Sequence, residues 1–451
     1  MMFQRFPAKG FMPWGMMAML MASVFTVSMG FGVVLPLLPY LIERLLGAGG
    51  NAGQVAQSTG LLTGLYMFAL FLFAPMWGKL SDLYGRRNIL VIGLAGFGTT
   101  MATFAFIETL AAVYAERFLS GMFAAAVTPV ALAAIGDIAA PDQTRARRLT
   151  FVSLAGVTGF LLGPMVGVFV AQGAAGILPA TSSGGALAFP LAATAMLAFI
   201  LAATAVKLLP RADKANPAAN QAPVPVPIAR TLMRLMLALS FIVSAAVGVF
   251  EVGLALRGKQ ELGLTPYQVA IMFTECSLVM IIVQTIVFAP WIKADTTRWF
   301  IAPALAILAI GLFLVPRAND FAMMLLVVGA VAASAGIISP ILTYWISSKA
   351  GHAQGSQLGK QTASASLGAA IGSAAGGLLF DVTWLPNASF VLIAAMTVLG
   401  LLISLTLPKM LLDGQQDDAE SRLQARLESM PANYSPIPVT TPGLPLIRNP
   451  L

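Results

Sequence analysis

Long apolar stretches without charge recur along the whole chain, and short polar segments separate them. A helix crosses a bilayer with about 20 mostly apolar residues and satisfies its backbone hydrogen bonds internally. The pattern therefore predicts an all-α polytopic membrane protein with twelve transmembrane helices. The predicted spans are residues 12–42, 56–78, 88–107, 110–138, 150–172, 186–209, 232–256, 267–292, 299–316, 321–347, 361–380 and 388–407.

Lysine and arginine lie mainly on one side of this predicted arrangement. If both termini are cytoplasmic, the outer segments and outer helix ends hold only Arg44, Arg117, Arg257, Lys259 and Arg317. Positive charge collects on the cytoplasmic side of membrane proteins, so this bias supports the orientation and an even number of spans. It also accounts for the net charge of +8 without nucleic acid as a partner.

The amino-acid composition excludes several kinds of functional site. Only 10% of the residues are charged, against roughly a quarter in soluble domains, so most of the surface faces lipid. Cys276 is the only cysteine and His352 the only histidine. This excludes a disulfide framework, a metal cluster of Cys and His, and a Ser-His-Asp triad. We expect no enzyme activity, no bound metal and no cofactor.

Two proline-rich segments divide the chain. Residues 210–230 are rich in Pro and Ala and are typical of an extended linker, and the end of the chain is polar and then Pro-rich. We predict a six-helix bundle at residues 1–209, a cytoplasmic linker at 210–230, a second six-helix bundle at 231–408 and a largely disordered cytoplasmic tail at 409–451.

A short internal repeat supports two related halves. The second predicted span ends in Phe73–Trp77 and the eighth in Phe288–Trp291, each with an Ala-Pro pair before the Trp. A basic–acidic–basic loop follows in both places. Repeats at equivalent positions of the two halves are typical of transporters.

The loop between the second and third predicted spans carries a dense pattern of glycine and charge. Its two glycines permit tight turns, its aspartate can cap a helix N-terminus, and its arginines can bind a carboxylate through two hydrogen bonds. At the cytoplasmic junction of two halves, such a cluster can hold one conformation and release it. A merely topological basic loop is the alternative. The residues concerned are Gly78, Asp82, Gly85, Arg86 and Arg87.

This loop matches the signature G-x-L-x-D-x-x-G-R-R, and in this the chain resembles the major facilitator superfamily. The resemblance implies two pseudo-symmetric six-helix bundles that act as a monomer in the lipid bilayer of the bacterial inner membrane. It implies alternating access for a small molecule or ion, driven by a proton or other ion gradient. It also implies that Asp82 faces Lys360 at the start of the eleventh helix, and that one of the arginines meets Asp137 at the end of the fourth.

The fifth predicted span carries a second motif. Its sequence is similar to the G-x-x-x-G-P-x-x-G pattern of exporters in this superfamily, chiefly drug–proton antiporters. Glycines four apart let a neighbouring helix approach closely, and a proline bends the helix. Ordinary close packing without a transport direction is the alternative. The matching residues are Gly159, Gly163, Pro164 and Gly167.

Three charged residues inside predicted spans are candidates for proton coupling and for the central cavity. Charge within the membrane is costly unless it is paired or hydrated. Arg117, followed by a glycine four residues later, resembles a superfamily arginine tied to proton coupling. We expect Arg117 and Glu251 to face each other across the cavity, with Glu275 as a further acid. The alternatives are an Arg117 that snorkels beside Glu116 and a Glu251 that lies near a loop.

These features favour a secondary active transporter that exports a small amphipathic compound in exchange for protons. The first predicted span holds no carboxylate, although many drug antiporters carry one there, so coupling would rest on Glu251 or Glu275. One alternative is an uptake or organellar permease for a metabolite, a metal ion or a metal chelate such as an iron siderophore. Another is a membrane sensor or scaffold that does not transport.

Overall fold

A computed structural model describes most of the chain. It covers residues 13–47, 50–104, 106–138, 148, 151–165, 185–210, 227–287, 294–349, 354–382, 387–408 and 410. Most of the predicted linker and nearly all of the predicted tail lie outside these residues, so both segments stay predictions.

The described residues are almost entirely helical and contain no β-strand. Each of the twelve predicted spans contains a helix, which confirms the predicted fold class. The helices are α1 (Trp14–Val34), η1 (Leu35–Leu37), α2 (Leu38–Leu46), α3 (Ala52–Tyr84), α4 (Arg86–Phe104), α5 (Leu110–Ile138), the helix Phe151–Met165, α7 (Gly185–Leu208), α8 (Pro227–Gln260), α9 (Pro266–Val287), η4 (Ala294–Phe300), α10 (Ile301–Leu314), η5 (Val315–Arg317), α11 (Phe321–Lys349), α12 (Gln354–Leu378) and α13 (Ala388–Ser404).

The first predicted span is not one straight helix. Pro36 and Pro39 stand at the starts of η1 and α2, where a missing N–H removes a helical hydrogen bond. The span therefore continues α1 through one 3₁₀ turn into a short second helix, α2, which ends at Gly47 with a positive φ.

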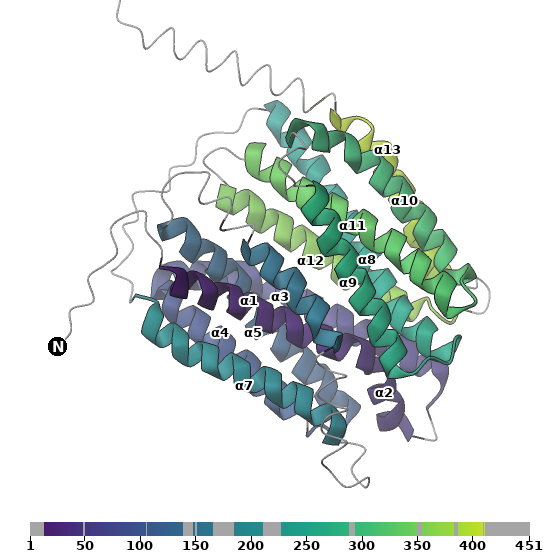
Figure 1. Cartoon of the computed structure of the whole chain (residues 1–451), viewed down its shortest axis with the longest axis horizontal. Helices are drawn as coiled ribbons and strands as arrows, with labels where there is room; N and C mark the ends of the chain where they lie inside the picture. Colours follow the sequence, from purple (N-terminus) through teal and green to yellow (C-terminus); the bar gives the residue numbers. More distant parts are fainter. Residues whose placement is uncertain are drawn as a thin grey trace, which may run out of the picture.

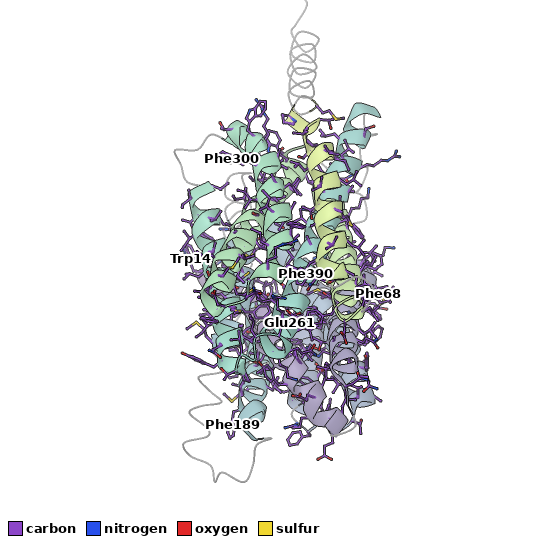
Figure 2. All side chains as sticks on the ribbon, turned by 90° about the vertical axis from the view of Figure 1, so that its right-hand side faces the viewer. Trp14, Phe68, Phe189, Glu261, Phe300 and Phe390 are labelled. Atoms are coloured by element: carbon purple, nitrogen blue, oxygen red, sulfur yellow. The ribbon has the colours of Figure 1, made fainter. Side chains whose placement is uncertain are left out.

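Apolar side chains cover the outside of the molecule as well as its interior. Eight helical segments in the described residues are long and apolar enough to cross a membrane. Trp14, Phe68 and Phe189 are exposed on this surface (Figure 2). A soluble protein would not expose so many large apolar side chains, whereas lipid solvates them.

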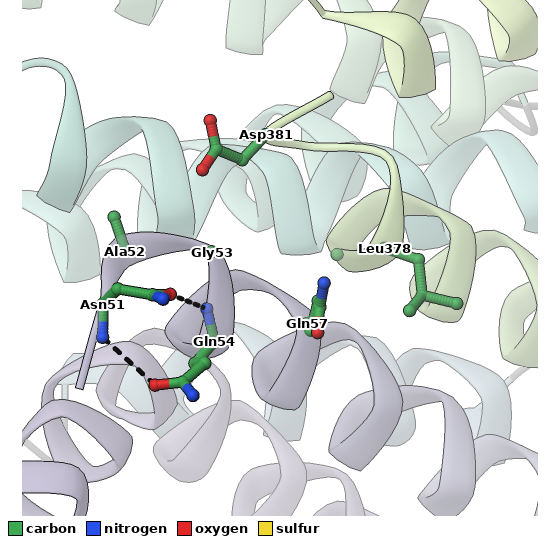
Figure 3. Close-up of a pocket in the computed structure, with 8 residues that line it drawn as sticks. Asn51, Ala52, Gly53, Gln54, Gln57, Leu378 and Asp381 are labelled. Carbon is green, nitrogen blue, oxygen red and sulfur yellow. Dashed lines mark hydrogen bonds between the residues drawn. The ribbon is translucent and has the colours of Figure 1, made fainter. Parts of the chain in front are cut away.

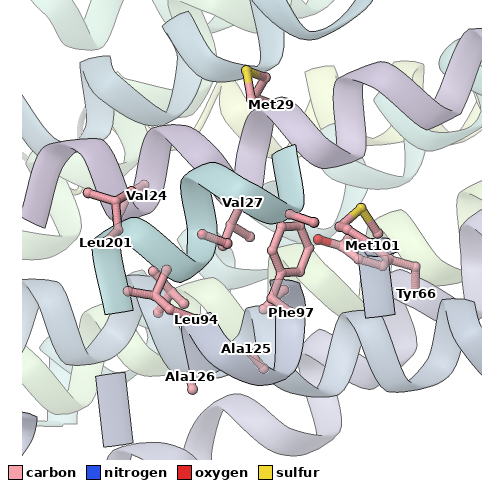
Figure 4. Close-up of a cluster of buried hydrophobic side chains, with 14 of the residues drawn as sticks. Val24, Val27, Met29, Tyr66, Leu94, Phe97, Met101, Ala125, Ala126 and Leu201 are labelled. Carbon is pink, nitrogen blue, oxygen red and sulfur yellow. The ribbon is translucent and has the colours of Figure 1, made fainter. Parts of the chain in front are cut away.

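The buried apolar side chains form two clusters. Figure 1 shows the helices that supply them as ribbons, with α1, α4, α5 and α7 on one side of the molecule and α9, α10, α11 and α13 on the other. Helices α1 to α7 supply nearly all of the first, which is shown around Leu94 and Phe97 in Figure 4. Helices α8 to α13 supply nearly all of the second. Three residues belong to the cluster of the other bundle: Val252 and Leu256 of α8 lie in the first cluster, and Leu35 of η1 lies in the second. These three residues join the two bundles.

Glycines bring helices into backbone contact at matching places in the two bundles. A Cβ on Gly159 would lie 2.2 Å from the Phe25 carbonyl oxygen of α1. A Cβ on Gly372 of α12 would lie 2.1 Å from the Ala245 carbonyl oxygen of α8. Both pairs join the first and fifth spans of a bundle, so the same close approach occurs twice.

A third glycine contact joins the bundles to each other. A Cβ on Gly60 of α3 would lie 2.6 Å from the Cα atom of Gly377 of α12. Helix α3 runs from Ala52 at one face of the molecule to Tyr84 at the other. We call the side of the molecule at Ala52 the Lys259 face and the side at Tyr84 the Asp82 face, after residues described below. The Gly60–Gly377 contact lies toward the Lys259 face.

Gly372→Ala is expected to lower the thermal stability of the purified protein by about 1–3 kcal/mol, because the added methyl group must push α8 and α12 apart. Thermal unfolding in detergent measures the effect. Gly359→Ala is the control in the same helix, where a Cβ meets no atom within 4 Å. That change should leave stability equal or slightly higher, since Ala is the better helix former. Equal effects at both positions would contradict the glycine contact.

Candidate functional site

The Asp82 face is built around the turn from α3 to α4. Gly85 ends α3 with a φ of +90°, a conformation that residues with a side chain rarely adopt, and α4 begins at the next residue. Arg86 Nη1 lies 2.5 Å from Asp82 Oδ1 and donates a 2.5 Å hydrogen bond to Ser81 Oγ. The buried Ser81 in turn donates to the Gly78 carbonyl oxygen at 2.8 Å. The charged side chains of Asp82 and Arg86 are thus bonded to each other and to a further residue of the same turn.

The expected partners of this loop are not all brought to it. Asp82 is 59% exposed and is paired with Arg86. Lys360 of α12 is exposed, and no ion pair with Asp82 occurs among the described side chains. The side chain of Asp137 lies outside the described residues. Arg87 is half-buried, and nothing near Gly78 explains a need for glycine there.

Arg117 lies deep inside α5 and is paired with its neighbour in sequence. Its Nε and Nη2 donate to the two carboxylate oxygens of Glu116 at 2.6 and 2.9 Å. The two side chains are only 2% and 4% exposed. The guanidinium also lies over the rings of Phe104 and Tyr66, at 4.6 and 5.7 Å from their centroids.

This arrangement differs from both interpretations of Arg117. The structure does not bring Arg117 to Glu251, and a side chain exposed by 2% does not snorkel to the surface. The sequence does not predict the pairing of Arg117 with Glu116, because residues adjacent in a helix point in different directions and their pairing has no spacing signal. A buried bidentate pair compensates both charges, and the loss of one partner would leave the other uncompensated.

Glu251 of α8 and Glu275 of α9 both lie in the second bundle. Glu275 Oε1 lies 3.3 Å from where a Cβ on Gly329 of α11 would stand, so the carboxylate is directed into the contact of α9 with α11. Among the described residues its other oxygen, Oε2, is buried and has no hydrogen-bond partner. Both acids thus belong to the bundle that does not contain the compensated Arg117.

The motif of the fifth span packs on α1. Gly163 meets the Met29 carbonyl oxygen, and Gly32 of α1 meets Pro164 and the Phe160 carbonyl oxygen. The ring of Phe160 stacks on Phe31, at 5.7 Å between centroids. The motif thus serves as a helix-packing surface in this structure. Gly167 lies outside the described residues.

Two clefts open at the Lys259 face, and neither contains a predicted site residue. One, of about 480 Å³, lies where α3 begins near the end of α12, and Figure 3 shows Asn51, Gln57 and Asp381 around it. The other, of about 310 Å³, is lined by Glu43, Lys259 and their neighbours. Both lie along the junction of the two bundles.

Comparisons with known proteins agree with this architecture. The family model described as "Major Facilitator Superfamily" matches residues 20–359 and 236–428. Multidrug resistance protein 1 of Bacillus subtilis (strain 168) is 27% identical over 375 residues, which are 81% of this chain and 90% of that protein. Quinolone resistance protein NorA of Staphylococcus aureus (strain COL) is 26% identical over 363 residues, which are 80% and 88%.

A solved structure extends the likeness to the fold. The human organic anion transporter MFSD10 (TETRAN) superposes with a TM-score of 0.62 at 19% identity, over 87% of this chain and 100% of that one. The family model covers most of the chain, and the described residues form two helical bundles joined by α3, η1, α8 and α12. The chain belongs to the major facilitator superfamily, a family of membrane transporters.

Proposed function

We propose that the chain exports a small amphipathic organic compound in exchange for protons. The observation that carries this proposal is the buried Oε2 atom of the half-buried Glu275, which has no hydrogen-bond partner among the described residues. The names of two relatives, a multidrug resistance protein and a quinolone resistance protein, support export of drug-like compounds.

Glu275 has the properties that a proton carrier needs. An ionised carboxylate without a donor is costly in apolar surroundings. Binding a proton removes this cost, and hydration from an open side lets the charge return. Glu251 of α8 is a second acid within the spans of this bundle, where a charge is likewise costly unless it is paired or hydrated. We assign proton coupling to Glu275, with Glu251 as a further acid.

We propose a structural role for Arg117 in place of proton coupling. Because Glu116 already neutralises it through two hydrogen bonds, it does not need a proton-binding partner elsewhere. Its contacts with Phe104 and Tyr66 tie α5 to α4 and α3. We propose that the pair keeps these three helices together as the first bundle moves.

The loop at the Asp82 face is proposed as the gate on that side. Asp82 and Lys360 are not paired here, and their meeting would require the bundles to close at this face. The ion pair of Asp82 with Arg86, the first residue of α4, holds the carboxylate at the turn between α3 and α4.

Flux measurements in proteoliposomes of known orientation test the proposed function. The panel contains ethidium, a quinolone, an amino acid and a ferric siderophore, each with and without an imposed pH gradient. We expect gradient-dependent transport of the amphipathic compounds. Transport of the siderophore or the amino acid alone would support an uptake permease and overturn the proposal.

Glu275→Gln should abolish the dependence of flux on a pH gradient, because the amide does not bind and release a proton. Exchange of labelled for unlabelled substrate, which needs no net proton movement, should continue. Glu108→Gln is the control, since Glu108 is an exposed carboxylate in the loop before α5. Undiminished gradient dependence in Glu275→Gln would assign the proton elsewhere.

Asp82→Asn should lower flux by at least about tenfold and leave thermal stability nearly unchanged, because an exposed ion pair stabilises a protein by about 0–1 kcal/mol. Flux and thermal unfolding, measured on the same preparation, separate a gating role from a folding role. Wild-type flux in this variant would remove Asp82 from the mechanism.

Arg117→Met should destabilise the protein by about 3–5 kcal/mol, since it leaves the carboxylate of Glu116 buried without a partner. The double variant Glu116→Gln/Arg117→Met should recover much of that stability, because no buried charge remains. Thermal unfolding of the single and double variants measures the coupling. Equal destabilisation in both would show that the two side chains do not act as a pair.

A further inference from the structure

The Lys259 face is closed by polar contacts that cross from one bundle to the other. Lys259, near the end of α8, lies with its Nζ 2.6 Å from Glu43 Oε2 of α2. The same Nζ donates to the Pro39 carbonyl oxygen at 3.0 Å and lies 5.3 Å from the centroid of the Tyr40 ring. One ammonium group of the second bundle therefore binds three neighbouring groups of the first.

Two further hydrogen bonds cross the same junction. The Tyr40 hydroxyl donates to the Leu264 carbonyl oxygen at 2.7 Å, and Gln260 Nε2 donates to the Ala52 carbonyl oxygen at 3.0 Å. We name this set the Lys259 latch. It consists of Pro39, Tyr40, Glu43 and Ala52 in the first bundle, and of Lys259, Gln260 and Leu264 in the second.

The end of α8, which carries Lys259 and Gln260, is fixed to the second bundle. Arg257, one turn or less before the latch residues of α8, is 5% exposed in its side chain and pairs with Glu261. Its Nη2 donates to the Ala318 carbonyl oxygen at 3.0 Å. The end of α8 is thus held to the segment between η5 and α11, so that Lys259 moves with its own bundle.

Close packing lies directly beneath the latch. The backbones of α3 and α12 touch at Gly60 and Gly377, and a Cβ on Gly64 would lie 2.8 Å from the Ala370 carbonyl oxygen. At the other face Asp82 and Lys360 are unpaired with each other and both exposed. The bundles are therefore bound together at the Lys259 face and not by these two residues at the Asp82 face.

We propose that the Lys259 latch sets how often the transporter opens at the face opposite the Asp82 loop. The latch must break when α2 and the end of α8 separate. Its members suit such a reversible contact, because Glu43 is 65% exposed and water can replace each bond as it breaks. The closed latch thus competes with the opening movement without preventing it.

Distances between spin labels test the latch without substrate or gradient. Because Cys276 is the only cysteine, a Cys276→Ala background accepts label pairs cleanly. Glu108→Cys with Asn319→Cys spans the junction at the Lys259 face, and Leu83→Cys with Thr296→Cys spans it at the Asp82 face. All four positions are exposed.

Lys259→Met should shift the label populations toward a longer distance at the Lys259 face and a shorter one at the Asp82 face. The shift in their ratio should be on the order of tenfold, since an ion pair, a charged hydrogen bond and a cation–π contact are each worth a few-fold. Tyr40→Phe, which loses one hydrogen bond and keeps the ring, should shift the ratio in the same direction by less. The swap Glu43→Lys/Lys259→Glu should restore part of the wild-type ratio.

Arg317→Met is the matched control. Arg317 is a cation at the same face, but its contacts lie within its own bundle, to the Phe313 carbonyl oxygen and ring. Its removal should leave both distances unchanged. Unchanged distances in a folded Lys259→Met variant, or equal shifts in Lys259→Met and Arg317→Met, would overturn the latch. Because the experiment uses neither protons nor substrate, its outcome is independent of proton-coupled export.

Discussion

A backbone that crosses lipid finds no water to hydrogen-bond, so each crossing segment must be a helix whose contacts with other helices come from packing. Dispersion forces act only at short range, and small residues let two backbones come close enough to use them. In this chain the tightest approaches occur at glycines on α12 and on the helix Phe151–Met165. The bundles and their junction depend on these contacts, and the charged residues are arranged around them.

The charged residues are compensated to three different degrees, which depend on how deeply they are buried and on whether their contacts must break when the bundles move. The pair of Arg117 with Glu116 is buried and fully compensated, and it belongs to one helix. Lys259 and Glu43 lie at an end of the molecule, where water can replace their bond. Glu275 has no compensating donor for Oε2, which is tolerable for a group that can exchange a proton. Proton coupling is thus proposed at the one of these three places where the charge is not compensated.

Much of the architecture could be predicted from the sequence because hydrophobic length is a strong signal in membranes. Each predicted span overlaps an observed helix, although α12 begins seven residues before its predicted span, α3 ends six residues after its own, and the first span breaks at Pro36 and Pro39. Contacts between distant residues have no such signal. Neither the Arg117–Glu116 pair nor the position of the Glu275 carboxylate beside Gly329 follows from spacing, because the first depends on side-chain rotamers and the second on how α9 lies against α11. The Lys259 latch likewise depends on the turn of α2.

The Arg117–Glu116 pair also bears on membrane voltage. A charge that crosses the full membrane potential changes the free energy by about 2.3 kcal/mol per 100 mV. These two opposite charges sit on adjacent residues of one helix and are locked together, so they travel as a neutral unit however the bundle rocks. The electric field does no net work on them. An intramembrane arginine, which by itself would resemble a voltage-sensing element, thereby contributes no net charge to any movement of the bundle across the field.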